Sequence, residues 1–481
     1  MRPIIIAFLL GVFLNTHAQE SIRPPSAVLP VPSAEQLAWH EMEMNAFIHF
    51  TTNTFTGKEW GLGDEKPAVF NPSAANPEQW ITVLKDSGFK GVILTTKHHD
   101  GFCLWPSKYT EHSVKNSPYK NGKGDIVKEV SDACKKNDLK FGIYLSPWDR
   151  NHAQYGKPAY IEYYRNQLKE LIANYGPVFE IWFDGANGGS GFYGGANENR
   201  KINGATYYDW PGTISLVRNM LPNVIFFSDA GPSIRWVGNE RGSAGKTNWN
   251  TISIDTLYAG KPGIDDLLNK GSEDGTSWVP AETDVSIRPG WFYHKEEDAL
   301  VKTPEQLFEI YLSSVGRGST LLLNMPPDRR GLIHENDVKS LKGFRKLLDS
   351  EFKNNLAVKA AIKASSYRGN SKIYAAEKML DNNTETYWAT NGAVTTATID
   401  IDLKGVKAIK YIVLQEYIKL GQRVKSFTVE ALIDNKWQTV EQATTIGYKR
   451  ILKLNNLKTN KIRISILDSK SCPLISSLKI Y

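Results

Sequence analysis

The chain has 481 residues, of which 41% are hydrophobic and 23% charged, and this length exceeds what one ordinary core supports, so we expect two soluble globular domains. The net charge of +7 is modest, and the lysines are dispersed without long runs, so we expect no nucleic-acid partner. The three cysteines have no spacing typical of a disulfide framework or a metal site, and we expect packed thiols: Cys103, Cys134 and Cys472.

Residues 1–18 predict an export signal. Arg2 supplies a positive start, residues 4–14 are apolar, and small residues precede a cleavage site before Gln19. The apolar run is too short to span a membrane, and no later run approaches that length. No Cys stands directly after the cleavage site, so a lipoprotein anchor is not indicated. We therefore expect an exported bacterial protein, periplasmic or secreted, without a membrane anchor.

From about residue 40 to residue 350, short apolar runs alternate with amphipathic stretches. We expect strands at residues 45–50, 91–96, 140–145, 178–183, 224–227, 278–280 and 320–324, and helices at residues 77–87, 125–137, 160–175 and 335–350. Apolar strands that alternate with helices indicate a parallel sheet covered on both faces. This α/β pattern predicts a (β/α)8-type, TIM-like barrel as the catalytic domain, residues 19–354. The Gly- and Asn-rich residues 185–215 are expected to form a long surface loop.

Beyond about residue 355 the helical periodicity fades. Short alternating runs, separated by turn residues, appear at residues 397–402, 410–414, 426–431, 461–466 and 476–480. This spacing predicts a C-terminal antiparallel β-sandwich domain, residues 355–481.

Within the predicted barrel, residues 178–186 form the most informative segment. Apolar and aromatic residues lead to one carboxylate, Asp184, and Gly185-Ala186 then ends the run. A charge at such a place costs free energy unless it is paired or used. Asp184 is therefore a candidate catalytic residue; alternatively, it caps the next segment or pairs with a buried arginine.

Functional groups of such barrels gather where the strands end. The ends predicted here carry His49, His98, His99, Tyr144, Trp148, Trp182, Asp184 and the segment 235–240. Each His could be a packing residue. The adjacent pair His98-His99 could bind one metal ion only if the backbone bends, because successive side chains of a strand point to opposite faces. Neutral imidazoles that hydrogen-bond to sugar hydroxyls fit better than a metal site.

Two carboxylates from separate strand ends suit glycoside hydrolysis. One must be ionised to attack the anomeric carbon, and the other must hold a proton for the leaving oxygen, which burial or the first charge favours. Sequence spacing does not give their separation, so retention and inversion of configuration both stay open at this point.

Four motifs in this order resemble the α-L-fucosidases of glycoside hydrolase family 29: residues 45–50, Lys97-His98-His99-Asp100-Gly101-Phe102, residues 142–146 and Ile181-Trp182-Phe183-Asp184-Gly185. The resemblance covers residues 35 to 350. It implies an exo-acting, retaining α-L-fucosidase that forms a covalent fucosyl intermediate on the nucleophile Asp184 and needs no cofactor. It also places around the fucose His49, Glu59, Trp60, His98, His99, Tyr144 and Trp182, and Trp291 either lines the site or packs.

The acid/base residue is assigned by the same resemblance. Glu240, at the end of Arg235-Trp236-Val237-Gly238-Asn239-Glu240, is similar to the glutamate of the subgroup that cleaves α-1,3 and α-1,4 fucosyl branches of Lewis type. Glu282 is the main alternative. The competing functions are a broad-specificity fucosidase that includes α-1,2 or aryl fucosides, a catalytically silent fucose-binding protein, and a metal-dependent hydrolase that uses the His pair.

Residues 358–481 resemble discoidin domains, the coagulation-factor C-type sandwich also found in family 32 carbohydrate-binding modules. The resemblance rests on residues 364–366, 376–380, 381–388 and 397–403. Oxygen ligands from Asp381, Asn383 and Thr386 would suit a structural calcium ion, and an Asx-turn without metal is the alternative. No cluster of exposed aromatics is evident in the loops, so bracing of the barrel is favoured over sugar binding. The oligomeric state stays open.

Overall fold

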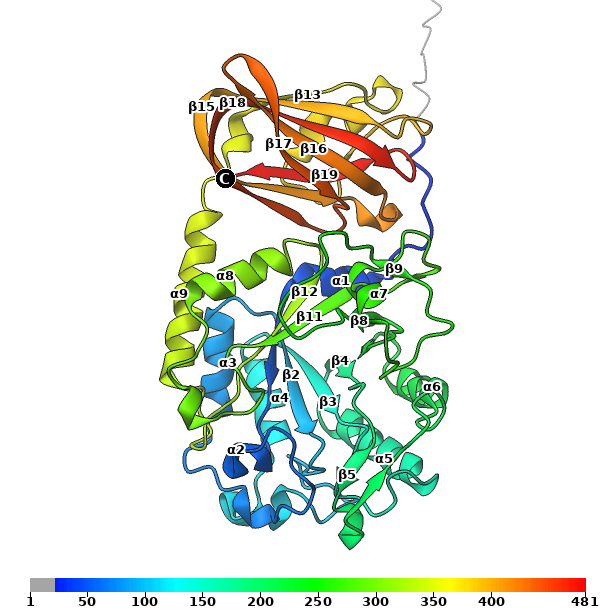
Figure 1. The fold of residues 1–481 in the computed structure, drawn as a ribbon, viewed down its shortest axis with the longest axis vertical. Coiled ribbons are helices and arrows are strands. Elements are labelled where there is room, and N and C mark those ends of the chain that lie inside the picture. The colour runs from blue at the N-terminus through cyan, green and yellow to red at the C-terminus, as the bar shows by residue number, and fades with distance from the viewer. Residues whose placement is uncertain (1–21) are drawn as a thin grey trace, which may run out of the picture.

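The computed structural model describes residues 22–481, so the predicted export signal lies outside the described residues. Within them, eight parallel strands close into a barrel in the order β1-β12-β11-β8-β7-β4-β3-β2 (Figure 1), which confirms the predicted fold class. The strands are β1 Met44–Ile48, β2 Gly91–Lys97, β3 Lys140–Leu145, β4 Val178–Trp182, β7 Ile225–Ser228, β8 Ile234–Trp236, β11 Ala281–Ser286 and β12 Thr320–Asn324. Across this same range, no helix has the length and apolarity needed to cross a bilayer.

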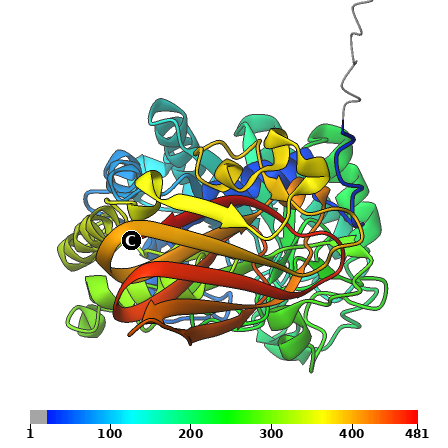
Figure 2. The same ribbon diagram turned by 90° about the horizontal axis from the view of Figure 1, so that it is seen from above.

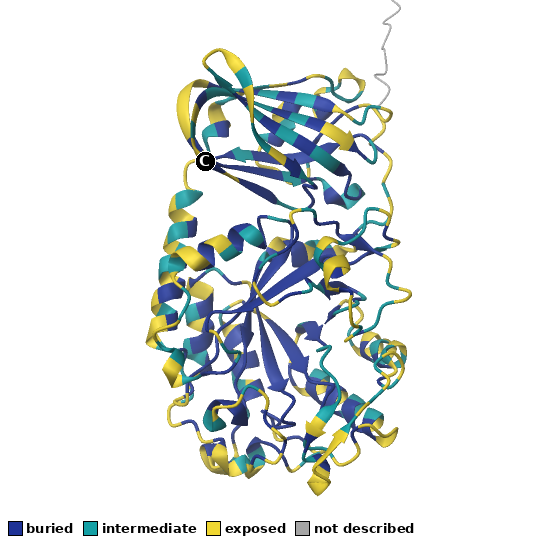
Figure 3. Cartoon of the chain, viewed as in Figure 1, coloured by how far each residue is buried: buried dark blue, intermediate teal, exposed yellow. Residues whose placement is uncertain are grey.

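Helices surround the barrel and cover its strands, which are buried along almost their whole length (Figure 3). The helices are α1 Ala34–Met42, α2 Thr52–Thr56, α3 Pro77–Asp86, α4 Ile126–Lys136, α5 Ala159–Asn174, α6 Trp210–Met220, α7 Asp265–Lys270, α8 Pro304–Ser313 and α9 Glu335–Glu351. Several helices are capped at their N-termini by a side chain: Asn76 caps α3, Asp125 caps α4, and Thr303 caps α8. Thr303 and Gln306 form a reciprocal capping box.

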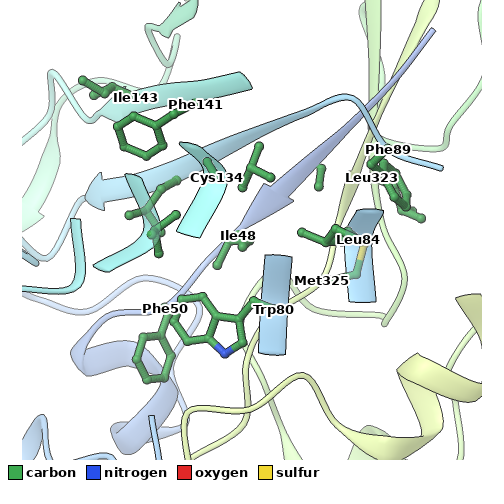
Figure 4. Close-up of a cluster of buried hydrophobic side chains, with 14 of the residues drawn as sticks. Ile48, Phe50, Trp80, Leu84, Phe89, Cys134, Phe141, Ile143, Leu323 and Met325 are labelled. Atoms are coloured by element: carbon green, nitrogen blue, oxygen red, sulfur yellow. The ribbon is translucent and has the colours of Figure 1, made fainter. Parts of the chain in front are cut away.

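The core between the barrel and its helices is apolar and tightly filled. Figure 4 shows Ile48 on β1 close to Trp80 and Leu84 on α3, and Ile143 beside Phe141 on β3; Ile48, Ile143, Trp80 and Leu84 are fully buried. Cys134 on α4 packs in the same cluster, and burial raises the pKa of its thiol to about 12. All three cysteines are buried and free, which confirms their prediction as packed thiols.

Three sequence predictions about the barrel were wrong. The run near residues 278–280 is β10 Ser277–Trp278, which pairs with β9 Thr251–Ile252 outside the barrel. Two barrel strands were missed, because β8 has only three residues and β11 carries polar residues into the barrel interior. The predicted loop 185–215 instead contains the hairpin β5 Gly189–Gly191 and β6 Glu198–Arg200, and then the start of α6.

The C-terminal domain is an antiparallel sheet structure around its own apolar core, as predicted. Its strands are β13 Ala361–Ala364, β14 Trp388–Ala389, β15 Ala397–Glu416, β16 Val424–Ile433, β17 Lys436–Thr444, β18 Arg450–Ser469 and β19 Leu474–Ile480. β15 and β18 each run through 20 residues, with register shifts on the way, so β15 joins two predicted strands into one.

The C-terminal domain lies against the end of the barrel that is opposite the carboxyl ends of the strands (Figures 1 and 2). The chain enters along this domain: Val28 N–H donates to the Leu420 carbonyl at 2.9 Å before α1 begins. An ion pair between Lys449 and Glu43 joins the domains further along. The two domains are thus connected by several segments that are distant in sequence.

Candidate active site

A cavity of about 430 Å³ opens at the carboxyl ends of the barrel strands. It is lined by Phe47, His49, Trp60, His98, His99, Tyr144, Trp182, Asp184, Gly185, Ala186, Asp229, Trp236, Glu240, Asp284 and Trp291. Of the residues that the sequence predicted for the site of the barrel, this lining lacks Glu59, Trp148 and the alternative acid/base residue Glu282. A lining that is mainly aromatic, with a few convergent polar groups, is typical of a small-molecule site.

Asp184 is the second residue after the end of β4, and it lies on the cavity wall. Its Oδ2 accepts a hydrogen bond from the Tyr144 hydroxyl at 2.9 Å, and its Oδ1 accepts one from the Ala186 N–H at 2.6 Å. Two such donors stabilise a carboxylate. The Ala186 contact is the cap that the sequence left as an alternative, but within residues 22–481 no Lys or Arg forms an ion pair with Asp184.

His99 faces Asp184, with 3.8 Å between its Nε2 and Asp184 Oδ2. Its Nδ1 lies 2.7 Å from Ser146 Oγ, and that hydroxyl donates its own proton to the Trp148 carbonyl. Ser146 Oγ therefore accepts from the His99 Nδ1–H, which leaves Nε2 as a hydrogen-bond acceptor toward the cavity. Burial lowers the pKa of His99 to about 4, so the ring is neutral at pH 7.

His49 has the same tautomer for a similar reason. Its Nδ1 lies 2.8 Å from Asn324 Oδ1, while the Asn324 amide donates to Ser286 Oγ and to the Trp291 carbonyl. Burial lowers the pKa of His49 to about 3 and that of His98 well below its usual range. The site therefore presents neutral imidazoles, which can exchange hydrogen bonds with hydroxyl groups without adding charge.

Glu240 lies at the exposed rim of the cavity, and its Oε2 accepts a hydrogen bond of 3.2 Å from the Trp291 indole N–H. Partial burial raises the pKa of Glu240, the Trp291 hydrogen bond lowers it, and the charges of Asp184 and Glu59 raise it. The net shift is upward. A carboxyl group with a raised pKa beside a carboxylate with two donors is the pairing that acid/base chemistry requires.

Glu59 lies next to the cavity and holds one of its loops. Its carboxylate accepts hydrogen bonds from the backbone N–H of Trp291 at 2.8 Å and of Phe292 at 3.2 Å, and His294 Nε2 lies 2.6 Å away. In this structure Glu59 therefore orients the loop that carries Trp291, and its predicted contact with a sugar stays a prediction.

Glu282, the alternative acid/base residue, is fully buried and does not line the cavity. Its Oε1 accepts a hydrogen bond from the indole N–H of Trp182 at 3.0 Å. Glu282 therefore supports the side chain of Trp182, which lines the cavity. Burial, together with the charge of Glu180, raises the pKa of Glu282 well above its usual range. The geometry favours Glu240 as the group that reaches a leaving oxygen.

Two acidic cavity residues, Asp229 and Asp284, were not singled out from the sequence. Asp229 follows β7 as Asp184 follows β4, and burial raises its pKa to about 7. Asp284 lies inside β11 and accepts the Trp236 indole N–H at 2.8 Å, and burial raises its pKa well above the usual range. The position of Asp229 at a strand end was a usable signal, whereas Asp284 was hidden because β11 was not recognised.

Trp60, which is 53% exposed, lines the mouth of the cavity, and the hairpin β5–β6 is connected to it. Arg150 joins the two: its Nη1 donates to the carbonyls of Trp60 at 3.1 Å and Gly61 at 2.7 Å, and its Nε donates to the Ser190 carbonyl at 2.6 Å. The guanidinium also lies 5.0 Å from the centroid of the Trp148 ring. The hairpin is therefore joined to a residue that lines the cavity.

No group of three or more metal-ligating side chains occurs in the part of the chain that the structure describes. In the predicted calcium turn, Asp381 Oδ1 accepts the Asn383 N–H at 3.0 Å, Asp381 Oδ2 accepts the Thr386 hydroxyl at 2.7 Å, and Asn383 Oδ1 accepts the Glu385 N–H at 3.0 Å. These bonds are those of an Asx-turn. They fit the metal-free alternative, and calcium binding by Asp381, Asn383 and Thr386 stays a prediction.

Comparison with known proteins gives a consistent result over both domains. Residues 24–351 match the family model described as alpha-L-fucosidase, and residues 361–478 match the F5/8 type C domain. Alpha-L-fucosidase 1 of Arabidopsis thaliana is 41% identical over 479 residues, which cover 98% of this chain and 92% of the relative. Plasma alpha-L-fucosidase of Homo sapiens is 26% identical over 310 residues, covering 61% of this chain and 57% of the relative.

Solved structures are similar over nearly the whole chain. A putative alpha-L-fucosidase from Bacteroides thetaiotaomicron has a TM-score of 0.87 at 41% identity and covers 95% of this chain and 98% of its own. A glycoside hydrolase family 29 fucosidase from Ruminococcus gnavus, solved in complex with fucose, has a TM-score of 0.85 at 34% identity and covers 95% of this chain and 96% of its own.

Proposed function

The chain belongs to the α-L-fucosidases of glycoside hydrolase family 29, and we propose that it releases terminal fucose from α-1,3- and α-1,4-linked branches with retention of configuration. As a member of this family it is a glycoside hydrolase that acts on fucosylated glycans. The observation that carries the mechanistic proposal is the opposite electrostatic setting of two carboxyl groups on one cavity: Asp184 with two hydrogen-bond donors, and Glu240 with a raised pKa.

In the proposed mechanism, Asp184 attacks the anomeric carbon of the fucosyl residue while Glu240 gives its proton to the departing glycosidic oxygen. The bond from carbon to the leaving sugar breaks as the ester bond to Asp184 forms. Water then attacks the same carbon, Glu240 takes up the proton of the water, and the Asp184 carboxylate leaves. No step requires a cofactor, because the two carboxyl groups supply the nucleophile and the proton.

The fucose is proposed to lie among His49, His98, His99, Tyr144 and Trp182, with Trp60 at the mouth. The Nε2 atoms of His49 and His99 would accept hydrogen bonds from sugar hydroxyls, since their Nδ1–H groups already donate to Asn324 and Ser146. The Trp182 ring, stacked on Phe227 at 3.9 Å between centroids, offers a rigid apolar surface to the sugar.

Three variants test the roles of the carboxyl groups on an α-1,3/1,4-fucosylated trisaccharide and on an activated aryl fucoside. Asp184→Asn should lower kcat by at least about 1,000-fold on both substrates. Glu240→Ala should lower kcat on the trisaccharide by about 100- to 10,000-fold, and azide should restore turnover of the aryl fucoside. Glu282→Gln is the matched control, and it should stay within about threefold of the wild type because an amide of nearly the same shape keeps an oxygen that can accept the Trp182 N–H.

Retained turnover in Asp184→Asn would exclude this residue as the nucleophile. Azide rescue of Glu282→Gln without rescue of Glu240→Ala would transfer the acid/base role to Glu282. A wild-type protein that binds fucose but cleaves neither substrate would establish the catalytically silent alternative.

The linkage preference rests on the similarity of residues 235–240 to the subgroup specific for α-1,3 and α-1,4 branches. We expect kcat/KM to be at least about 100-fold, or 2.7 kcal/mol, higher for Lewis-type trisaccharides than for an α-1,2-linked fucoside. Equal values would support the broad-specificity alternative.

We also infer export to the periplasm or the medium, on the basis of residues 1–18. N-terminal sequencing of the protein purified from a bacterial host should begin at Gln19, and retention of Met1 on the mature protein would contradict this inference.

A further inference from the structure

The strand that leads to Glu240 is weakly held within the barrel. β8 has three residues, the fewest of the barrel strands in residues 22–481, and it registers with only two residues on each neighbour: Phe227 and Ser228 of β7, and Ala281 and Glu282 of β11. A strand this short gains little from its ladder bonds, so its position must be set by other contacts.

Arg235, at the centre of β8, provides such contacts outside the barrel. Its side chain is fully buried, and it donates to the Leu268 carbonyl at 2.8 Å, to Asn248 Oδ1 at 3.1 Å, to the Trp249 carbonyl at 3.0 Å and to the Val279 carbonyl. Within the described chain, no carboxylate forms an ion pair with this guanidinium. A buried cation without a counter-ion depends on every one of its hydrogen-bond acceptors. The segment 248–249 is therefore needed to hold β8.

The C-terminal domain fixes this segment from the other side. Gln422 Oε1 accepts the Asn250 N–H at 2.8 Å and its amide Nδ2 at 3.1 Å, and Gln422 Nε2 donates to the Asn248 carbonyl at 3.0 Å. Thr445 Oγ1 accepts the Asn248 N–H at 2.9 Å. Asn248, Asn250 and Gln422 are each no more than 3% exposed, so water does not replace these bonds.

The two loops that carry Gln422 and Thr445 are themselves joined by a buried carboxyl group. Glu416 accepts the N–H groups of Arg423 at 2.8 Å, of Val424 at 2.9 Å and of Gly447 at 2.7 Å. Because Glu416 joins them, these two loops of the C-terminal domain form one unit that binds residues 248–250.

We propose that the C-terminal domain takes part in catalysis by bracing β8 through the bridge Gln422–Asn248–Arg235, and that Gln422 is a positioning residue for the acid/base group. This inference rests on the proposed role of Glu240. It gives the domain a function in the reaction itself, whether or not its surface binds sugar.

The test compares wild type, Gln422→Ala, Thr445→Val and the control Gln438→Ala in the full-length chain. Gln438 is exposed on β17, away from the bridge. The readout is kcat/KM on two fucosides, because this constant reports the step in which the leaving group departs. A trisaccharide needs a proton from Glu240 for departure, whereas an aryl fucoside with a strongly acidic phenol does not.

We expect Gln422→Ala to lower kcat/KM on the trisaccharide by about three- to tenfold, with the aryl fucoside within about twofold of wild type, because misplacing an acid by a fraction of an ångström weakens proton transfer only. Thr445→Val should act in the same direction, and Gln438→Ala should match the wild type. An equal loss on both substrates, or no loss on either, in both bridge variants would overturn the proposal.

Amide hydrogen exchange of residues 235–250 supplies a readout that does not depend on activity. It should become faster in Gln422→Ala than in Gln438→Ala, while exchange of β2 and β3 stays unchanged. If the wild type cleaves neither fucoside, the proposed function fails; unchanged exchange in both bridge variants would overturn the brace by itself.

Discussion

Among single residues, the four carboxyl groups of the site differ in their burial and in the hydrogen bonds that they accept. Asp184, Asp229, Glu240 and Asp284 line one cavity, but only Asp184 accepts hydrogen bonds from both a tyrosine hydroxyl and a backbone N–H. Burial raises the pKa of the other three. Asp184 is therefore suited to act as a nucleophile, whereas the other three carboxyl groups are suited to hold protons.

The bond from Trp291 to Glu240 gives a prediction for the pH profile. Trp291→Phe removes a donor that stabilises the Glu240 carboxylate, so the pKa of Glu240 should rise further. Since Glu240 must be protonated for cleavage, kcat/KM is lost as the pH rises through this pKa, and the basic limb should move to higher pH. Loss of the hydrogen bond should also lower the maximum by about fivefold, or 1 kcal/mol.

The measurement is kcat/KM of wild type and Trp291→Phe on the trisaccharide over a range of pH. Movement of the basic limb to lower pH would show that Trp291 does not act on the acid/base group in this way.

At the element scale, the rim of the cavity consists of loops whose positions depend on single side chains. Gly185, in the segment that follows β4, approaches Asp229 so closely that a Cβ at this position would lie 2.0 Å from Asp229 Oδ2. The glycine is therefore required by the packing of β4 against the end of β7, and not only by a turn. Arg150 similarly connects the segment at Trp60 to the hairpin β5–β6.

Replacement of Arg150 should affect substrate binding more than chemistry. Arg150→Met keeps most of the aliphatic side chain but removes three donors to the carbonyls of Trp60, Gly61 and Ser190. We expect KM to rise about three- to tenfold with kcat within about threefold, because the loss is of binding that ground state and transition state share. Arg218→Met, at an exposed position of α6, is the matched control.

Steady-state kinetics on the trisaccharide decide this prediction. A fall in kcat with an unchanged KM would mean that Arg150 acts on the reacting groups instead of on the mouth.

At the scale of the whole molecule, two domains share an interface that reaches the outer layer of the barrel. The C-terminal domain contacts the barrel through Gln422 and Thr445 and through the ion pair Lys449–Glu43, and the N-terminal segment crosses the same domain at Val28. Since these contacts come from distant parts of the chain, we expect both domains to unfold in a single transition.

A structural calcium ion would appear as a change in the stability of this assembly. If Asp381, Asn383 and Thr386 bind calcium, millimolar Ca²⁺ should raise the Tm of wild type by a few degrees and leave that of Asp381→Ala unchanged. Calorimetry with and without a chelator is the measurement. An equal Tm of wild type under both conditions would establish the Asx-turn alternative, and the chelator should leave activity unchanged.

The sequence alone predicted the features that follow from local patterns of apolar and polar residues. Short apolar runs such as residues 91–96, alternating with helical stretches, predicted the parallel barrel. The strand ends at His49, His98 and Asp184 predicted one site, because parallel strands bring their carboxyl ends to the same edge. It did not find β8, β11 or Asp284, since a three-residue strand and a strand with inward-facing acids have no distinctive period.

The contacts between side chains of different elements became known from the folded structure alone. The tautomers of His49 and His99 depend on Asn324 and Ser146. The carboxyl group of Glu240 accepts a hydrogen bond from Trp291. The segment that contacts β8 is bound by Gln422 of the other domain. Such contacts join residues separated by up to 275 positions. These contacts are stabilised by burial and hydrogen bonding that exist only after the chain has folded. No local pattern in the sequence can therefore predict them.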